Sequence, residues 1–227
     1  MDLDINFQYP QQIDPWMEFK LPDDVVKYLW KIVKKGEEKN ENMKNTLAGN
    51  ISQSFKLEDE NNYFQNEICL PLAHKYLEKV KQPNLLKINH IAVDKNGKVL
   101  TPTNWTLALQ SLWANYQLKH EFNPIHDHGG AFSFVVWLKI PYSCEEQKKL
   151  PFLNGTSDGG KVPGTFQFQY TNLNGEITNT CYQLDESYEG TMLFFPAKLR
   201  HGVYPFYETD EKRVSVSGNM EVVFQYE

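Results

Sequence analysis

The chain has 227 residues, a formal net charge of −6 at pH 7, 41% hydrophobic residues and 14% aromatic residues. This composition excludes a disordered chain and favours an ordinary folded enzyme with a sizeable core. The acidic balance, with lysines spread along the sequence, makes nucleic acid an unfavourable partner.

Cysteine usage and the N-terminus predict a cytoplasmic protein. The three cysteines, Cys69, Cys144 and Cys181, are odd in number and widely spaced, which disfavours a disulfide framework. Residues 1–4 are acidic and start no signal peptide. No apolar stretch approaches the roughly 18 residues of a membrane span, so we expect no membrane association.

The first hundred residues carry helical patterns. Asp23 and Asp24 open an apolar-periodic run that ends in lysines and Gly36, which predicts a helix between them. Residues 37–50 are polar and predict a loop or the start of a second helix. A helical pattern follows over residues 60–81, where Pro71 should kink or split it. Residues 88–93 and 98–100 flank Asn96-Gly97 and predict a tight hairpin.

From residue 105 the hydrophobic period changes to two, which predicts β-strands. The expected strands are 105–118, 131–140, 165–171, 191–195, 202–207, 213–219 and 221–226, with a hairpin turn at residues 172–175. This pattern favours a mainly β (α+β) fold, a double-stranded β-helix (jelly roll) buttressed by N-terminal helices. We expect a single domain over residues 1–227, with 1–104 as the helical buttress and hairpin and 105–227 as the jelly-roll core. Residues 150–164 are expected to form either a mobile loop at a cavity mouth or a surface connection.

Three histidines are the most informative residues. His126 and His128 are two apart in an extended segment, so their side chains point to the same side. His201 follows an apolar run, residues 193–196, far downstream. Neutral imidazole is a common ligand of iron, zinc, copper and nickel. The three histidines therefore predict one metal site; His74, His90 and His120 lack such a context.

An arginine follows the last of these histidines. Arg213 comes twelve residues after His201 and opens an alternating run with Ser215 and Ser217. Alternate residues of a strand face one side, so Arg213 and Ser215 can contact the same ligand. An arginine fork matches a carboxylate bidentately, which predicts a carboxylate-binding position.

In order and spacing, these residues resemble the iron(II)- and 2-oxoglutarate-dependent oxygenases. That superfamily's signature is His-x-Asp/Glu, a long gap, a second His, and an Arg some ten residues later. Over residues 105–225 the chain is similar to the prolyl-hydroxylase-like branch and its phage and marine-bacterial relatives. Their run "LFFPSxLxHxVxP…RxSxSxN" is matched here by residues 193–196, His201, Val203, Pro205, Arg213, Ser215, Ser217 and Asn219.

The resemblance departs from the common signature at one ligand. His128 stands where a carboxylate is usual, and the adjacent Asp127 should face away on a regular strand. Either all three histidines bind metal, or His126 and His201 bind together with Asp127 brought in by a local turn or bulge, or water or co-substrate completes a two-histidine site. Without the carboxylate, the metal site carries about one more positive charge, and a dianionic keto acid could offset this charge.

The resemblance also implies cofactors and further site residues. Iron(II), the co-substrate 2-oxoglutarate and O₂ are expected, with Arg213 and Ser215 holding the distal carboxylate of 2-oxoglutarate. Tyr116 lies ten residues before His126, at an offset where prolyl-hydroxylase-like enzymes place a co-substrate tyrosine. Asn115 is a second polar candidate, expected on the opposite strand face from Tyr116.

The expected function is a dioxygenase that hydroxylates a C–H bond of a small-molecule or peptide substrate, such as a prolyl or other amino-acid residue. A phage-encoded protein would act in the host cytoplasm. Two alternatives stay open: a three-histidine cupin-like dioxygenase that does not use 2-oxoglutarate, and a non-catalytic jelly-roll binding module. Arg213 with Ser215 argues against the first, because such an enzyme needs no buried anchor for a distal carboxylate.

Overall fold

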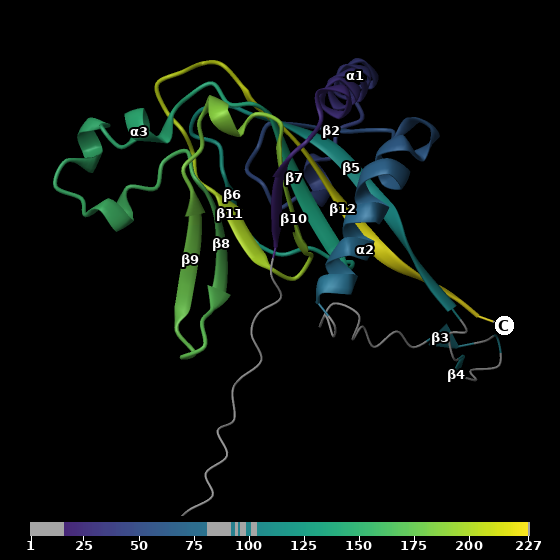
Figure 1. Cartoon of the computed structure of the whole chain (residues 1–227). Helices are drawn as coiled ribbons and strands as arrows, with labels where there is room; N and C mark the ends of the chain where they lie inside the picture. Colours follow the sequence, from purple (N-terminus) through teal and green to yellow (C-terminus); the bar gives the residue numbers. More distant parts are fainter. Residues whose placement is uncertain (1–15, 81–91, 94, 96–98, 101–103, 227) are drawn as a thin grey trace, which may run out of the picture.

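A computed structural model describes residues 16–80, 92–93, 95, 99–100 and 104–226 (Figure 1). The helices are α1 (Asp23–Lys39), η1 (Lys44–Thr46), η2 (Glu60–Asn62), η3 (Gln65–Cys69), α2 (Leu70–Lys79), α3 (Cys144–Gln147), η5 (Pro151–Leu153), η6 (Asp158–Gly160) and η7 (Glu186–Tyr188). The strands are β1 (Met17–Lys20), β2 (Gln53–Lys56), β3 (Ala92–Val93), β4 (Val99–Leu100), β5 (Asn104–Gln117), β6 (Asn123–His126), β7 (Phe132–Lys139), β8 (Phe166–Thr171), β9 (Ile177–Tyr182), β10 (Thr191–Pro196), β11 (Arg200–Val203) and β12 (Arg213–Gln225).

The strands form two main antiparallel sheets. The larger sheet has the order β1-β10-β7-β12-β5-β2, and the smaller has the order β6-β11-β8-β9. Helices α1 and α2 lie on the side of the larger sheet away from the smaller one (Figure 1). The fold is mainly β, a jelly roll with N-terminal helices, which confirms the fold class predicted from the sequence.

The larger sheet is buried on both faces, and side-chain alternation assigns each residue to a face. In β7, Phe134 and Val136 belong to the hydrophobic cluster shared with the helices. The intervening Val135 and Trp137 belong to the cluster shared with the smaller sheet, which includes Phe166 of β8. A shift of one residue would exchange the two faces, so burial on both sides fixes the strand register.

Helix α1 begins where its acidic start predicts but runs three residues past Gly36. A Cβ on Gly36 would lie 2.5 Å from Leu57 Cδ2 and 2.9 Å from the Lys56 carbonyl oxygen. Gly36 therefore permits close approach to β2, and the helix stops at Asn40, which has a left-handed φ of 54°. The expectation that Gly36 ends the helix was wrong for this reason.

The helical pattern over residues 60–81 is present in three pieces. The short η2 is followed by the π-helical turn η3 and then by α2, with Pro71 in the first turn of α2. The backbone stays helical from η3 into α2, and the π-helical turn just before Pro71 stands where the sequence predicts a kink or split. Cys69 and Ala73 are fully buried against the larger sheet.

Most strands downstream of residue 104 were predicted, with differences at their ends. The two expected C-terminal strands are one continuous β12 with a register shift between Asn219 and Met220, and β11 begins at Arg200 and ends at Val203. The turn at residues 172–175 joins β8 to β9, and Gly175 there has φ +83°. Four short strands were not predicted: β1, β2, β6 and β9.

Two other expectations concern connecting segments. Strands β3 and β4 pair antiparallel as the predicted hairpin requires, whereas residues 88–91 and 96–98 of that hairpin lie outside the described residues. Residues 150–164 form the turns η5 and η6, and none of them lines the cavity described below. None of the described helices is long and apolar enough to cross a membrane.

Candidate metal centre

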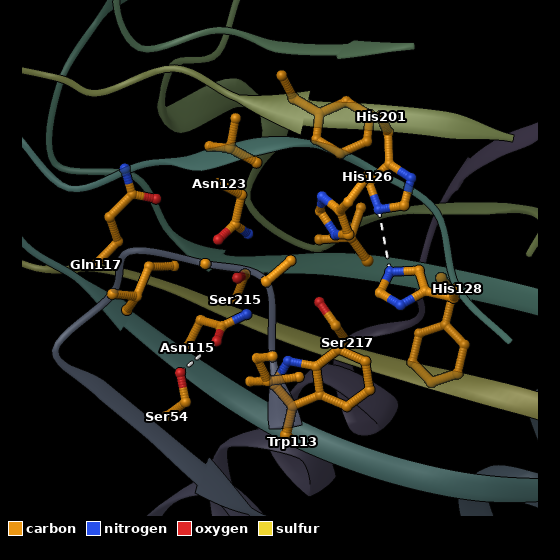
Figure 2. Close-up of a pocket in the computed structure, with 18 of the residues that line it drawn as sticks. Ser54, Trp113, Asn115, Gln117, Asn123, His126, His128, His201, Ser215 and Ser217 are labelled. Atoms are coloured by element: carbon orange, nitrogen blue, oxygen red, sulfur yellow. Dashed lines mark hydrogen bonds between the residues drawn. The ribbon is translucent and has the colours of Figure 1, made fainter. Parts of the chain in front are cut away.

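The three predicted histidines meet at one end of the space between the two sheets (Figure 2). His126 ends β6 and pairs directly with His201 of β11. His128 follows β6 and is held by a hydrogen bond from its backbone N–H to the Ala197 carbonyl at 2.9 Å. One ring nitrogen from each histidine lies within 4.8 Å of the others, so the three can share one ion.

Backbone carbonyls determine which ring nitrogens can bind a metal. His126 Nδ1 lies 2.7 Å from the Pro124 carbonyl oxygen, and His201 Nδ1 lies 2.9 Å from the Leu199 carbonyl oxygen. A carbonyl only accepts hydrogen bonds, so each Nδ1 carries the proton and donates. Each Nε2 then keeps its lone pair, which is the usual arrangement around a metal-bound histidine.

Burial keeps the imidazoles of His128 and His201 neutral. Burial lowers the pKa of His128 to about 4 and that of His201 to about 3, and the nearby His126 lowers both. At neutral pH both rings are therefore unprotonated at one nitrogen, as metal coordination requires.

Asp127 points to a different environment. Its Oδ1 accepts a hydrogen bond from Lys198 Nζ at 2.9 Å in an ion pair that is largely exposed on both sides. Asp127 lines the cavity rim, but it is not among the residues whose ligand atoms converge. This placement supports the three-histidine alternative over the one that uses Asp127.

The other end of the cavity carries a buried cation. The cavity measures about 180 Å³, and its lining includes all three histidines, Arg213 and Ser215. Arg213 is only 4% exposed; its Nη1 donates to the Tyr142 hydroxyl at 2.7 Å and its Nη2 donates to Gln117 Oε1. Among the described residues, no carboxylate lies within ion-pair distance of Arg213, so an anionic ligand would offset its buried charge.

The floor of the cavity is formed by facing residues of β5 and β12. Ser215 pairs with Asn115, and Ser217 pairs with Trp113, and all four line the cavity. Asn115 is buried, and its Oδ1 accepts a hydrogen bond from Ser54 Oγ of β2 at 2.7 Å. Its amide nitrogen is therefore the group available to a ligand in the cavity.

Tyr116 lies on the opposite face of β5. Its hydroxyl donates to Glu37 Oε2 at 3.2 Å, its ring packs edge-on against Phe55, and it belongs to the cluster shared with the helices. Tyr116 does not line the cavity, which contradicts the expectation that it faces the co-substrate. Strand parity explains the error: only one of two adjacent residues can face the cavity, and here it is Asn115.

Sequence reasoning missed two residues that contact Arg213. Gln117 is the cross-strand partner of Arg213 and accepts a hydrogen bond from it. Tyr142, which also accepts one, lies in the bend after β7. The alternation with Asn115 could have indicated Gln117, once the pairing of β5 with β12 was known. For Tyr142, no sequence signal links it to Arg213.

One family of known proteins matches part of this chain. Residues 111–219, just under half of the chain, match the family described as "Putative 2OG-Fe(II) oxygenase". This segment is similar to 2OG-Fe(II) oxygenase domains. The cofactors of such a domain are iron(II), 2-oxoglutarate (2OG) and O₂. The matched segment includes His126, His128, His201, Arg213 and Ser215.

Solved structures similar to this chain include three oxygenases. A Pseudomonas putida prolyl-4-hydroxylase is 13% identical with a TM-score of 0.46, and 91% of each chain is covered. A Trichoplax adhaerens prolyl hydroxylase, solved with a peptide fragment of the hypoxia inducible factor oxygen degradation domain, is 10% identical with a TM-score of 0.47, covering 93% of this chain and 83% of that one. A Burkholderia pseudomallei 2OG-Fe(II) oxygenase family protein is 17% identical with a TM-score of 0.35, covering 51% of this chain and 43% of its own length. Comparison with curated protein sequences gave no match.

The residues present fit an iron(II) ion. Two nitrogens bound at about 2.1 Å to one ion and at right angles lie roughly 3.0 Å apart, taking zinc–imidazole bond lengths as a guide. His128 Nε2 and His201 Nε2 are 3.2 Å apart (Figure 2). Three neutral imidazoles suit a divalent first-row metal and leave further coordination positions for other ligands.

Proposed function

We propose that this protein is an iron(II)- and 2OG-dependent dioxygenase that hydroxylates a C–H bond of a small-molecule or peptide substrate. The observation that carries the proposal is the pairing of two features in one cavity: three convergent imidazoles at one end and a buried, unpaired Arg213 at the other. A single ligand with a metal-chelating end and a carboxylate at the far end matches both features, and 2OG has this form.

Each group would have a separate part in binding. His126, His128 and His201 would hold the iron through neutral nitrogens. Arg213 would bind the distal carboxylate of 2OG, with Ser215 as a second donor two residues along the same strand face. Asn115, across from Ser215, would orient the middle of the co-substrate through its amide nitrogen.

The iron and 2OG would supply the oxidising chemistry, with one oxygen atom of O₂ going to the substrate C–H bond and the other to succinate as CO₂ is released. The protein's part is to exclude water and fix positions. Trp113, Phe134, Trp137, Phe166 and Phe195 line the cavity with apolar surface. This surface lowers the local polarity and would strengthen the contact of Arg213 with a bound carboxylate.

For the substrate itself, we propose a prolyl or other amino-acid residue, free or in a peptide, as the first class to test. Resemblance to the prolyl-hydroxylase-like branch motivates this choice, and a non-peptide metabolite is the alternative. Fold alone does not decide between these substrates.

Metal content and 2OG turnover together test the proposal. Purified protein, loaded with iron(II) under nitrogen and then exposed to air, should bind about one iron per chain and convert 2OG slowly to succinate without a prime substrate. Iron binding without any effect of 2OG would instead favour the three-histidine dioxygenase that needs no co-substrate. Failure to bind iron, zinc or cobalt would favour a non-catalytic binding module.

A further inference from the structure

Gln117 is the residue that links Arg213 to the rest of the fold. It is 1% exposed, lines the cavity and pairs across the sheet with Arg213. Its Oε1 accepts a hydrogen bond from Arg213 Nη2, and its Nε2 donates to the Glu121 carbonyl at 2.6 Å. Because Arg213 only donates and the Glu121 carbonyl only accepts, the amide can adopt only this orientation.

The partner of Gln117 is itself held in place. The Glu121 carboxylate accepts hydrogen bonds from the backbone N–H of Leu118 at 2.8 Å and of Ser52 at 2.9 Å. Glu121 thus ties the turn after β5 to the segment before β2, and the cavity is lined by Ile51 of that segment and by Ser54 of β2. The Glu121 carbonyl thus holds the amide nitrogen of Gln117, and the amide oxygen of Gln117 holds the guanidinium of Arg213.

The protein partners of Arg213 are both neutral. Burial raises the pKa of Tyr142 to about 12, so its phenol is uncharged at neutral pH, and Tyr142 in turn donates to the Gly164 carbonyl at 2.7 Å. A guanidinium has five N–H donors. Two of these are occupied by Gln117 and Tyr142, and the other three have no partner among the residues that the structure describes. The fold therefore orients Arg213 without cancelling its charge.

A glutamate at position 117 would change this balance. It has nearly the same shape as glutamine and can accept from Arg213, but it would pair a negative charge with the guanidinium. It would also lose the hydrogen bond to the Glu121 carbonyl. The amide at position 117 is thus what leaves the cation unpaired.

We propose that Gln117 is a positioning residue that sets co-substrate selectivity: it aims Arg213 into the cavity and keeps its charge available, so that a 2-oxo acid with a distal carboxylate is preferred over one with a neutral end. This inference rests on the proposed function, because it takes the ligand of Arg213 to be 2OG. In this role Gln117 acts through Arg213 and does not contact the iron.

The test compares two ligands that differ only at the distal end. Binding of 2OG and of its 5-methyl ester is measured by calorimetry on zinc-loaded protein, which cannot turn over. Wild-type protein should bind 2OG at least tenfold more tightly than the ester. Gln117→Glu should reduce this ratio at least tenfold by weakening 2OG alone, while the ester binds within about threefold of its wild-type affinity.

Two further variants separate charge and position from general damage. Gln117→Leu removes the support but adds no charge, so it should weaken 2OG several-fold and keep a clear preference for it over the ester. Gln147→Glu makes the same change at a buried glutamine outside the cavity, whose Oε1 accepts from the Tyr207 backbone N–H. Gln147→Glu should leave the ratio unchanged.

The outcomes distinguish two failures. If wild-type protein prefers 2OG but Gln117→Glu keeps the full ratio, or weakens both ligands equally, the role of Gln117 is overturned and the proposed function stands. If wild-type protein binds both ligands equally, no distal carboxylate is recognised, and the assignment of Arg213 fails together with that of Gln117.

Discussion

His126 and His201 are direct partners in the antiparallel ladder between β6 and β11, and their ring centroids lie 4.4 Å apart. Each ring is oriented by a carbonyl two residues before it, at Pro124 and at Leu199. The same hydrogen bond, from a ring Nδ1 to the carbonyl two residues earlier, thus occurs for both histidines. It leaves the Nε2 lone pairs of both rings free to bind one ion, from segments 75 residues apart in the sequence.

These two histidines should be essential for metal binding. His126→Ala and His201→Ala should each lose stoichiometric iron, because two remaining imidazoles bind a divalent ion weakly. Iron per chain is measured by mass spectrometry of the metal after desalting. His74→Ala, an exposed change on α2, is the matched control and should keep full iron. Full occupancy in either cavity variant would sink the assignment.

His128 and Asp127 should behave differently from each other. His128→Ala should lose iron, because its Nε2 lies 3.2 Å from His201 Nε2. Asp127→Ala should retain iron, because that carboxylate is paired with Lys198 in an exposed ion pair that contributes roughly 0–1 kcal/mol to stability. The opposite pattern, iron lost only in Asp127→Ala, would identify Asp127 as the ligand.

The sequence predicts the chemistry of this site better than its geometry. The spacing of His126 and His128 was sufficient to place them on one face, because residues two apart on an extended segment share a face. His201 joins them through the pairing of β11 with β6. The choice between Asn115 and Tyr116 was not available from spacing, because it depends on which face of β5 meets the smaller sheet. That face is set by long-range burial, with helices on one side and β8 and β11 on the other.

Two short strands at sheet edges, β6 and β2, also could not be predicted from the sequence. Strand β6 has four residues, includes Pro124 and ends at His126, so no alternating pattern marks it. It exists because its neighbour β11 supplies hydrogen-bond partners. Strand β2 similarly depends on β5, which it joins at the edge of the larger sheet.

Asn115 and Tyr116 are neighbours in β5 whose side chains lie on opposite faces, so their effects on 2OG binding can be compared directly. Asn115→Ala should weaken 2OG binding to metal-loaded protein by about three- to tenfold, in line with the loss of one hydrogen bond of roughly 0.5–1.5 kcal/mol. Tyr116→Phe should leave 2OG binding unchanged, because its hydroxyl contacts Glu37 on the far side of β5. Isothermal titration with 2OG measures both. A larger effect for Tyr116→Phe would contradict the placement of these two side chains.

Metal-free protein should lose stability in acid through His128 and His201. Their pKa values in the folded state, about 4 and about 3, lie below the usual 6.5, so the unfolded chain takes up protons first as pH falls. The free energy of unfolding should be unaffected by these groups above pH 6.5 and should fall as pH drops toward 4. One pKa unit corresponds to about 1.4 kcal/mol.

Denaturant titrations between pH 7 and pH 4, with a chelator present, measure this effect. His201→Asn should show a shallower loss than wild-type protein, since one of the two depressed groups is gone. His74→Asn should follow the wild-type curve. Identical curves for all three proteins would show that the cavity histidines do not contribute.

Arg213 should determine the affinity for 2OG without affecting the metal. It is buried, its protein partners are the neutral Gln117 and Tyr142, and it lines the same cavity as the histidines. Charged hydrogen bonds contribute about 1.5–3 kcal/mol each, and every 1.4 kcal/mol is about tenfold in affinity. Arg213→Ala should therefore weaken 2OG binding roughly ten- to a hundredfold while iron stays at the wild-type level. Ser215→Ala should have a smaller effect in the same direction.

The lysine variant tests the geometry of this contact. Arg213→Lys keeps the charge but loses the planar fork, and an ammonium cannot donate to Gln117, Tyr142 and a carboxylate with the same geometry. It should recover only part of the 2OG affinity lost in Arg213→Ala. Calorimetry with 2OG, alongside metal content of the same samples, separates the two effects. Unchanged 2OG affinity in Arg213→Ala would remove the main argument against a three-histidine dioxygenase that does not use 2OG, and that function would then be preferred.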